Sequence, residues 1–178
     1  MKFSIHSIET APEQSKPLLE KSLKGIGMIP NLHGVLAESP AVLEAYQELT
    51  RLFTQTSFSK EEITVIWQTI NAEHECHYCL PAHFAVAHSM GVDADVIDAL
   101  QRKSDLPTEK LRVLKETTLT LVRNRGRIDA ADIQKFAQVG FTKQQLLEVV
   151  LGISHKVISN YVNHFSETSL DEPFKKFV

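Results

Sequence analysis

The sequence predicts an all-α protein, folded as a single helical bundle of about eight to ten helices. Three observations carry this prediction. Apolar residues recur at helical spacing along most of the 178 residues. Residues typical of helix starts and stops separate these stretches. No segment shows the alternating apolar and polar pattern of a β-strand. The helices are therefore expected to pack on one another around one core, in one domain that spans residues 1–178.

The first part of the chain is expected to hold three helices. The first covers 12–23, so residues 1–30 form an N-terminal arm plus this helix. A short helix is expected over 32–36. A longer one over 41–53 follows Ser39 and Pro40, an N-cap with proline at the first helical position. Its apolar face consists of Val42, Leu43, Tyr46, Leu49 and Phe53.

The remaining helices follow from similar signals. Ser59 and Glu62 have the spacing of a capping box and predict a helix that contains Trp67. A helix from about Cys76 should end before Gly91, which favours a stop. Further helices are expected from Asp93 or Asp95 to Leu100, and over 111–122, 129–139 and 142–165, with Gly140 between the last two.

Composition limits the classes of partner. The net charge is -3, with 43% hydrophobic and 23% charged residues, which is ordinary for a soluble globular protein. This charge gives no reason to expect a nucleic-acid or membrane partner. No secretory signal and no apolar run of about 20 residues is present, so we expect a cytoplasmic protein. Nothing in the sequence calls for a cofactor.

The segment from Glu73 to His83 is the most informative. It contains the only two cysteines, Cys76 and Cys79, and His83 follows four residues later. Structural disulfides do not persist in a reducing compartment. A CxxC pair there indicates redox catalysis or metal binding.

A helical arrangement gives this segment a chemical logic. At about 100° per residue, Cys76, Cys79 and His83 share one face, and Glu73 joins them if the helix extends one turn upstream. A helix N-terminus favours the thiolate, which is the nucleophile. His83 could move a proton, and Glu73 could orient it. One cysteine would then resolve the sulfenic acid formed on the other.

Two other interpretations compete with redox catalysis. The cysteines could be small buried residues. They could also bind zinc together with His83 and a fourth ligand, namely His74, His77, His155 or His164. A redox-sensing or zinc-binding helical protein is therefore the alternative to an enzyme. Trp67 and Tyr161 are expected in the core or at an interface rather than at a substrate.

The sequence also resembles the carboxymuconolactone decarboxylase superfamily, in its alkylhydroperoxidase-D-like (AhpD-like) branch. The resemblance rests on Cys76-His77-Tyr78-Cys79 with His83 and on the lead-in 58–62, and it extends to 30–33, 39–43, 140–150 and 160–171. It implies an oligomeric all-α fold, as a dimer, trimer or hexamer. It also implies a peroxidase or disulfide reductase in which Cys76, Cys79 and His83 act on a hydroperoxide or a disulfide, and an external protein or lipoyl-type dithiol restores the thiols.

The resemblance has two departures. A proton-relay glutamate is expected twelve residues before the first cysteine, where this chain has Thr64. Glu61 and Glu62 would need a register shift, and Glu75 would point away, so Glu73 is the expected substitute. Some members carry histidine directly before the second cysteine, where this chain has Tyr78. A decarboxylase-like lyase is a further alternative, but that branch does not depend on a cysteine pair.

Overall fold

A computed structural model describes residues 2–178, and this part of the chain is all-α, as predicted. It holds nine α-helices and two short 3-10 helices: η1 (Glu13–Ser15), α1 (Lys16–Ile26), α2 (Asn31–Leu36), α3 (Pro40–Thr54), α4 (Lys60–Glu73), α5 (Cys79–Ser89), α6 (Ala94–Gln101), α7 (Glu109–Arg123), α8 (Ala130–Gln138), α9 (Lys143–Ser166) and η2 (Glu172–Phe177).

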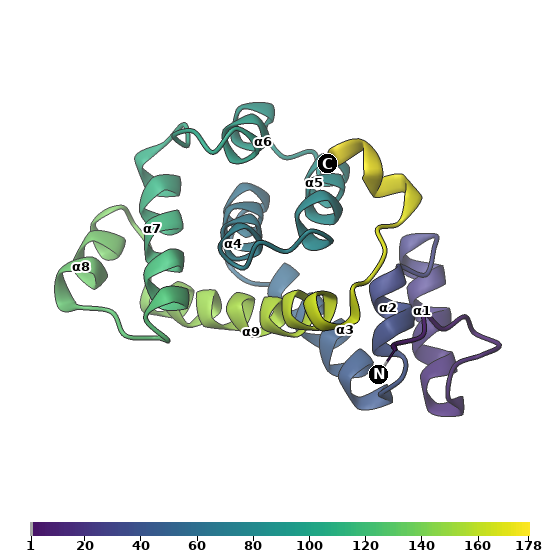
Figure 1. Cartoon of the computed structure of the whole chain (residues 1–178). Helices are drawn as coiled ribbons and strands as arrows, with labels where there is room; N and C mark the ends of the chain where they lie inside the picture. The colour runs from purple at the N-terminus through teal and green to yellow at the C-terminus, as the bar shows by residue number, and fades with distance from the viewer. Residues whose placement is uncertain (1) are drawn as a thin grey trace.

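Helix α4 lies at the centre of the bundle. Figure 1 shows α5, α6, α7 and α9 around it, with α8 beyond α7 on one side and α1 and α2 on the opposite side. Every residue of α4 from Glu62 to Asn71 is buried. This helix therefore lacks a solvent face over most of its length, which is the pattern of a helix enclosed by others.

Two hydrophobic clusters fill the interior. The larger one joins α4 to α6, α7, α8 and α9 and includes Ile66, Ile70 and Leu114. The smaller one lies among α1, α2, α3 and the start of α5, and it contains both Cys76 and Cys79. The cysteine pair is thus inside the protein, at the place where the N-terminal helices meet the central ones.

Helix α9 comes very close to α3 and α4, and a glycine makes this possible. A Cβ atom on Gly152 would lie 2.8 Å from two ring atoms of Phe53 and 3.0 Å from a methyl group of Ile66. Since Gly152 has no side chain, the helices can approach to this distance. The contact fixes the position of α9, which carries several residues of the site described below.

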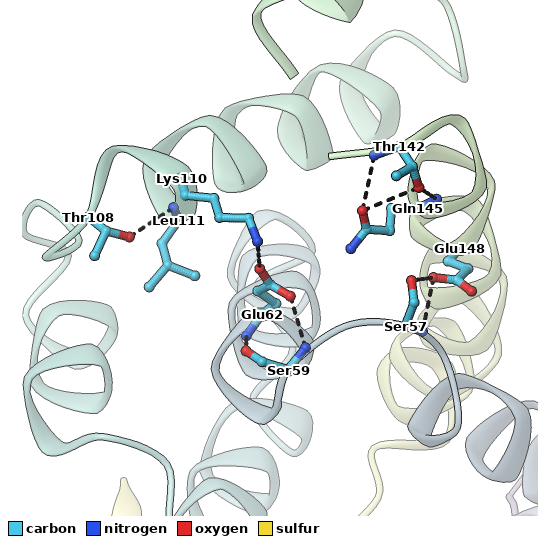
Figure 2. Close-up of polar contacts among 9 residues, drawn as sticks. All are labelled: Ser57, Ser59, Glu62, Thr108, Lys110, Leu111, Thr142, Gln145 and Glu148. Carbon is cyan, nitrogen blue, oxygen red and sulfur yellow. Dashed lines mark hydrogen bonds and ion pairs between the residues drawn. The ribbon is translucent and has the colours of Figure 1, made fainter. Parts of the chain in front are cut away.

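Side-chain caps define where several helices begin (Figure 2). The Ser59 hydroxyl accepts the Glu62 N–H at 3.2 Å, and the Glu62 carboxylate accepts the Ser59 N–H at 2.8 Å. This is the predicted capping box. Thr142 and Gln145 form a second one at the start of α9. The predicted helix starts near 59 and 142 are therefore confirmed.

The prediction was wrong at the start of α5. This helix begins at Cys79 rather than near Cys76, and α4 is a separate helix that ends at Glu73. Glu75 between them has a φ of 51°, in the left-handed region, so the helical path is interrupted there. The chain also forms η2 after α9, which was not predicted, and this segment runs back along α5 (Figure 1).

Among residues 2–178, no helix combines the length and the apolar character that crossing a lipid bilayer requires.

Candidate functional site

The CxxC segment forms a tight turn that leads into α5. The carbonyl of Cys76 accepts the N–H of Leu80 at 3.1 Å, and its sulfur accepts the N–H of Cys79 at 3.2 Å. Cys76 lies three residues before α5, whose N-cap residue is Tyr78, and it supplies acceptors to two of the first N–H groups of this helix. Cys79 is the first residue of the helix. The two sulfurs are thus held together at a helix N-terminus, where the dipole favours negative charge.

Buried amides hold this turn in place. The Asn71 side chain donates to the carbonyl of Cys79 at 3.3 Å, and its oxygen accepts the Asn160 amide at 2.9 Å. The Asn163 amide donates to the Cys79 sulfur at 3.2 Å and lies 4.0 Å from the Cys76 sulfur. Asn71 comes from α4 and the other two from α9. Two helices therefore fix the cysteine pair: α4, which directly precedes the turn, and α9, which lies far along the chain.

A fully buried lysine accompanies the cysteines. Lys156 on α9 has no exposed surface, and its ammonium donates to Nε2 of His83 at 2.7 Å. Burial lowers the pKa of Lys156, and the neighbouring Cys79 and Cys76 oppose that shift. A buried cation of this kind is costly unless an anion compensates it. The nearby Cys79 thiolate is the group that can do so.

The two thiols are free and have different acidities. Burial opposes ionisation of Cys79, but the hydrogen bond from Cys76 and the charge of Lys156, with Ser159 and Asn163, hold the pKa of Cys79 well below its ordinary value. The bond to Cys79 and burial raise the pKa of Cys76. Of the two sulfurs, Cys79 is thus the one at which this environment favours the thiolate.

His83 is a neutral imidazole in this site. Burial, with the charge of Lys156 and the proximity of His155, holds the pKa of His83 well below its usual range. Since Nε2 accepts from Lys156, the proton of the ring lies on Nδ1. Nδ1 is buried and has no hydrogen-bond partner among residues 2–178. The ring also contacts Trp67, with centroids 4.6 Å apart.

His155 has a structural role. Its Nδ1 accepts from the Trp67 indole at 3.1 Å, and its Nε2 lies 2.9 Å from the Thr50 hydroxyl. Both ring nitrogens are therefore occupied. Burial, with the Lys156 charge and the proximity of His33, holds the pKa of His155 well below its usual range. This imidazole orients Trp67 and is not free to bind a metal.

A cavity of about 660 Å³ leads to Cys79. Cys79 and His83 line it, whereas Cys76 and Lys156 do not. The wall is mostly apolar and aromatic and includes Leu32, Tyr46, Trp67, Tyr78, Ala82, Val86, Met90 and Phe174. Trp67, predicted as core, is both buried and part of this wall. A molecule in the cavity would therefore contact Cys79 and not Cys76.

Glu73 lies elsewhere, in contrast to its predicted place beside the cysteines. Both of its carboxylate oxygens accept from Arg123 of α7, at 2.8 and 2.7 Å. The paired Arg123 lowers the pKa of Glu73, although partial burial of the carboxylate opposes this shift. Because α4 ends at Glu73 and α5 starts at Cys79, the common helical face assumed for these residues does not form. The structure thus joins Cys76, Cys79 and His83, without Glu73.

The other candidate relay positions are also occupied by structural contacts. The Thr64 hydroxyl donates to the carbonyl of Lys60 at 2.8 Å. Glu62 caps α4 and pairs with Lys110 at 2.7 Å (Figure 2). Lys156 is therefore the ionisable partner of the thiol and imidazole groups. The sequence contained a signal for it, because Lys156 lies four residues after Gly152 and seven before Asn163, which places all three on one face of α9.

The zinc ligand set is not assembled in the part of the chain that the structure describes. The additional histidines considered for it make other contacts. His74 bonds to Asn160, His77 faces the carbonyl of Thr168, and His164 faces the carbonyl of His74. The lysine bound to Nε2 of His83 occupies the nitrogen that a metal would need.

Comparisons with known proteins concern the fold. No protein-family model matches the sequence, and no curated protein matches it. A solved structure of the alkylhydroperoxidase AhpD core, an uncharacterized peroxidase-related protein from Ralstonia eutropha JMP134, has a TM-score of 0.84 and 18% identity, over 97% of this chain and 93% of that chain.

Two further structures are similar. A peroxidase-related protein from Silicibacter sp. TM1040 has a TM-score of 0.81 and 19% identity, over 98% of this chain and 92% of that chain. The debrominase Bmp8 has a TM-score of 0.77 and 15% identity, over 93% of this chain and 90% of that chain. At these identities the likeness concerns the fold alone. The chain has the fold of the alkylhydroperoxidase AhpD core.

Proposed function

We propose that the chain is a dithiol oxidoreductase that reduces organic hydroperoxides and cycles between a Cys76–Cys79 dithiol and an intramolecular disulfide. One observation carries the proposal. The sulfur with the lowered pKa, Cys79, faces a cavity beside a buried cation, and the second sulfur lies directly behind it. A nucleophile, a charge partner and a resolving thiol are thus in one place.

In the first step, the Cys79 thiolate attacks the terminal oxygen of the hydroperoxide. The O–O bond breaks, the sulfur becomes a sulfenic acid, and the alkoxide leaves. Lys156 supplies the proton that converts the alkoxide to an alcohol, through His83, to which it is hydrogen-bonded. The amide of Asn163 stabilises the thiolate beforehand.

In the second step, the Cys76 thiol attacks the sulfur of the Cys79 sulfenic acid. A disulfide forms, and the hydroxyl of the sulfenic acid leaves as water with the thiol proton. An external dithiol then reduces the disulfide and is itself oxidised, and of its two protons one returns to Cys76 and the other replaces the one that Lys156 gave up. Cys76 is completely buried and does not line the cavity, so a reductant that uses the cavity attacks Cys79. A lipoyl-type arm or a protein dithiol would serve, and a reducing compartment such as the cytoplasm would supply it.

A homo-oligomer is part of the proposal. Helix α9 exposes Leu147, Val150, Tyr161 and Phe165, at 73%, 47%, 54% and 60% of their surface. These residues recur at helical spacing and form one apolar stripe. A second copy of the chain would cover such a stripe. Light scattering of the purified protein measures the assembly, and Leu147→Glu should shift it toward the monomer if the stripe is the interface.

The central test follows the two thiols through one turnover. The reduced protein is treated with one equivalent of cumene hydroperoxide, free thiols are counted, and the Cys76–Cys79 disulfide is mapped by mass spectrometry. We expect both thiols to be lost together, because the chain has no other cysteine. Cys76→Ser should stop at a sulfenic acid on Cys79, whereas Cys79→Ser should not react. Rapid oxidation of Cys79→Ser would refute the assignment.

Steady-state turnover distinguishes an enzyme from a redox sensor. With excess dithiothreitol and hydroperoxide, an enzyme consumes many equivalents of peroxide per chain, and a sensor consumes about one. Metal analysis of the same sample tests the zinc alternative. Stoichiometric zinc, bound so that it prevents oxidation of the thiols, would contradict the proposal.

A further inference from the structure

The cavity runs from the protein surface to a buried sulfur. Its lining includes exposed residues of α1 and α3, among them Lys21, Ile26 and Arg51, and it includes Cys79, of which only 1% is exposed. A substrate must therefore enter between α1 and α3 to reach the thiolate. The cavity volume of about 660 Å³ lies in the range of sites for molecules far larger than hydrogen peroxide.

The inner wall offers little to a charged group. Apolar side chains and neutral imidazoles surround the path, and burial lowers the pKa of His33 to about 4, so this ring is uncharged at neutral pH. His83 and His155 are neutral for the same reason. The body of a bound molecule would thus lie against apolar surface, which favours hydrocarbon.

The mouth of the cavity carries positive charge. Among residues 2–178, the charged side chains that line the cavity are Lys21 and Arg51. Arg51 is already paired with Glu48, at 2.8 and 2.5 Å. Lys21 lies near the same carboxylate but forms no ion pair within 4.0 Å in the described chain. This leaves a net positive charge at the mouth of a protein whose overall charge is -3.

We propose that the substrate of this site is an amphipathic hydroperoxide with an apolar body and a carboxylate head. The head would lie at Lys21 and the O–O group at Cys79. This inference rests on the proposed function, and it adds the chemical class of the substrate and the residue that selects it. A hydroperoxide without a charged group would contact the same apolar wall but not Lys21, and hydrogen peroxide would need neither the apolar wall nor Lys21.

Binding of molecules without a peroxide group tests the inference apart from catalysis. Octanoate, methyl octanoate and octyltrimethylammonium share a chain and differ in head charge. Each is titrated into reduced wild-type protein by calorimetry. Fluorescence of Trp67, the only tryptophan, reports occupancy of the cavity because Trp67 lines it. We expect octanoate to bind about fivefold more tightly than the ester, from a partly exposed ion pair of roughly 1 kcal/mol, and the cation to bind weakest.

Two lysine variants on α1 supply the matched comparison. Lys21→Gln should remove the preference for octanoate over the ester. Lys24→Gln, three residues along the same helix, should keep it, since Lys24 is exposed and does not line the cavity. Equal affinity of the wild type for octanoate and its ester, no binding of any probe, or an equal effect of both variants would overturn the inference.

The failure of the proposed function would look different. A protein that prefers octanoate but consumes no hydroperoxide would leave the ligand class standing and contradict the peroxidase. A protein that reduces cumene hydroperoxide but shows no preference for the acid would contradict the ligand class alone.

Discussion

Replacement of Lys156 by methionine should lower the rate of peroxide reduction strongly while the protein stays folded. Methionine fills a similar volume and removes the ammonium, so Cys79 loses the charge that favours its thiolate and His83 loses its donor. Two unit charges about 4 Å apart attract by about 4 kcal/mol at an effective dielectric constant of about 20. Part of this is offset, because the lysine no longer has to be buried as a cation.

We therefore expect the rate constant for reaction with cumene hydroperoxide to fall by about 100-fold at pH 7, which corresponds to roughly 2.7 kcal/mol. The variant should recover with rising pH. Since its Cys79 is mostly protonated at neutral pH, each pH unit raises the thiolate population by about tenfold until the thiol has titrated. The wild-type protein should show no comparable rise with pH, because the pKa of its Cys79 is already low.

Stopped-flow oxidation of the reduced proteins across pH 6–9, followed by Trp67 fluorescence or by thiol loss, measures both the fall in rate at pH 7 and its recovery at higher pH. The free energy of unfolding provides the control. Cys79 can take up a proton once the ammonium is removed, so no charge is left unpaired, but Nε2 of His83 loses its hydrogen bond. Urea denaturation of the reduced variant should therefore show a loss of only about 1–3 kcal/mol, and the variant should remain folded. A variant that is stable and reacts at the wild-type rate, with the same pH profile, would refute the role of Lys156.

Three other predictions concern residues at different distances from the thiols. Glu73→Gln should change the peroxide rate by less than about threefold, because its carboxylate pairs with Arg123; a loss near that of the cysteine variants would restore Glu73 as the relay. Burial lowers the pKa of His33 from 6.5 to about 4, so between these pH values the unfolded chain binds a proton that the folded chain does not. The free energy of unfolding should therefore fall by roughly 3 kcal/mol because of this residue as the pH falls from 7 to 4. Urea denaturation of the wild type and of His33→Gln measures this difference. Gly152→Ala should destabilise the fold by about 1–3 kcal/mol because its methyl group would meet Phe53, and an unchanged thermal midpoint would contradict this close packing.

Much of the fold could be predicted because its signals are local. Capping residues such as Ser59 and Thr142 act on N–H groups within one turn, and they begin the helices where the sequence indicated. The 3–4 spacing of apolar residues likewise reports which face of a helix is buried. The start of α5 escaped this reasoning because Glu75 adopts a left-handed conformation that no glycine announces.

The proposed reacting groups of the candidate site follow from the sequence alone, since Cys76, Cys79 and His83 lie within eight residues of one another. The groups that surround them depend on tertiary contacts. Lys156 and Asn163 come from α9, more than seventy residues further along the chain, and they reach the thiols because Gly152 lets that helix approach α3 and α4. The same packing leaves Glu73 on Arg123, and it opens the cavity toward Cys79 rather than Cys76. Local spacing encodes which side chains are neighbours on one segment, whereas charge, burial and access depend on contacts between segments.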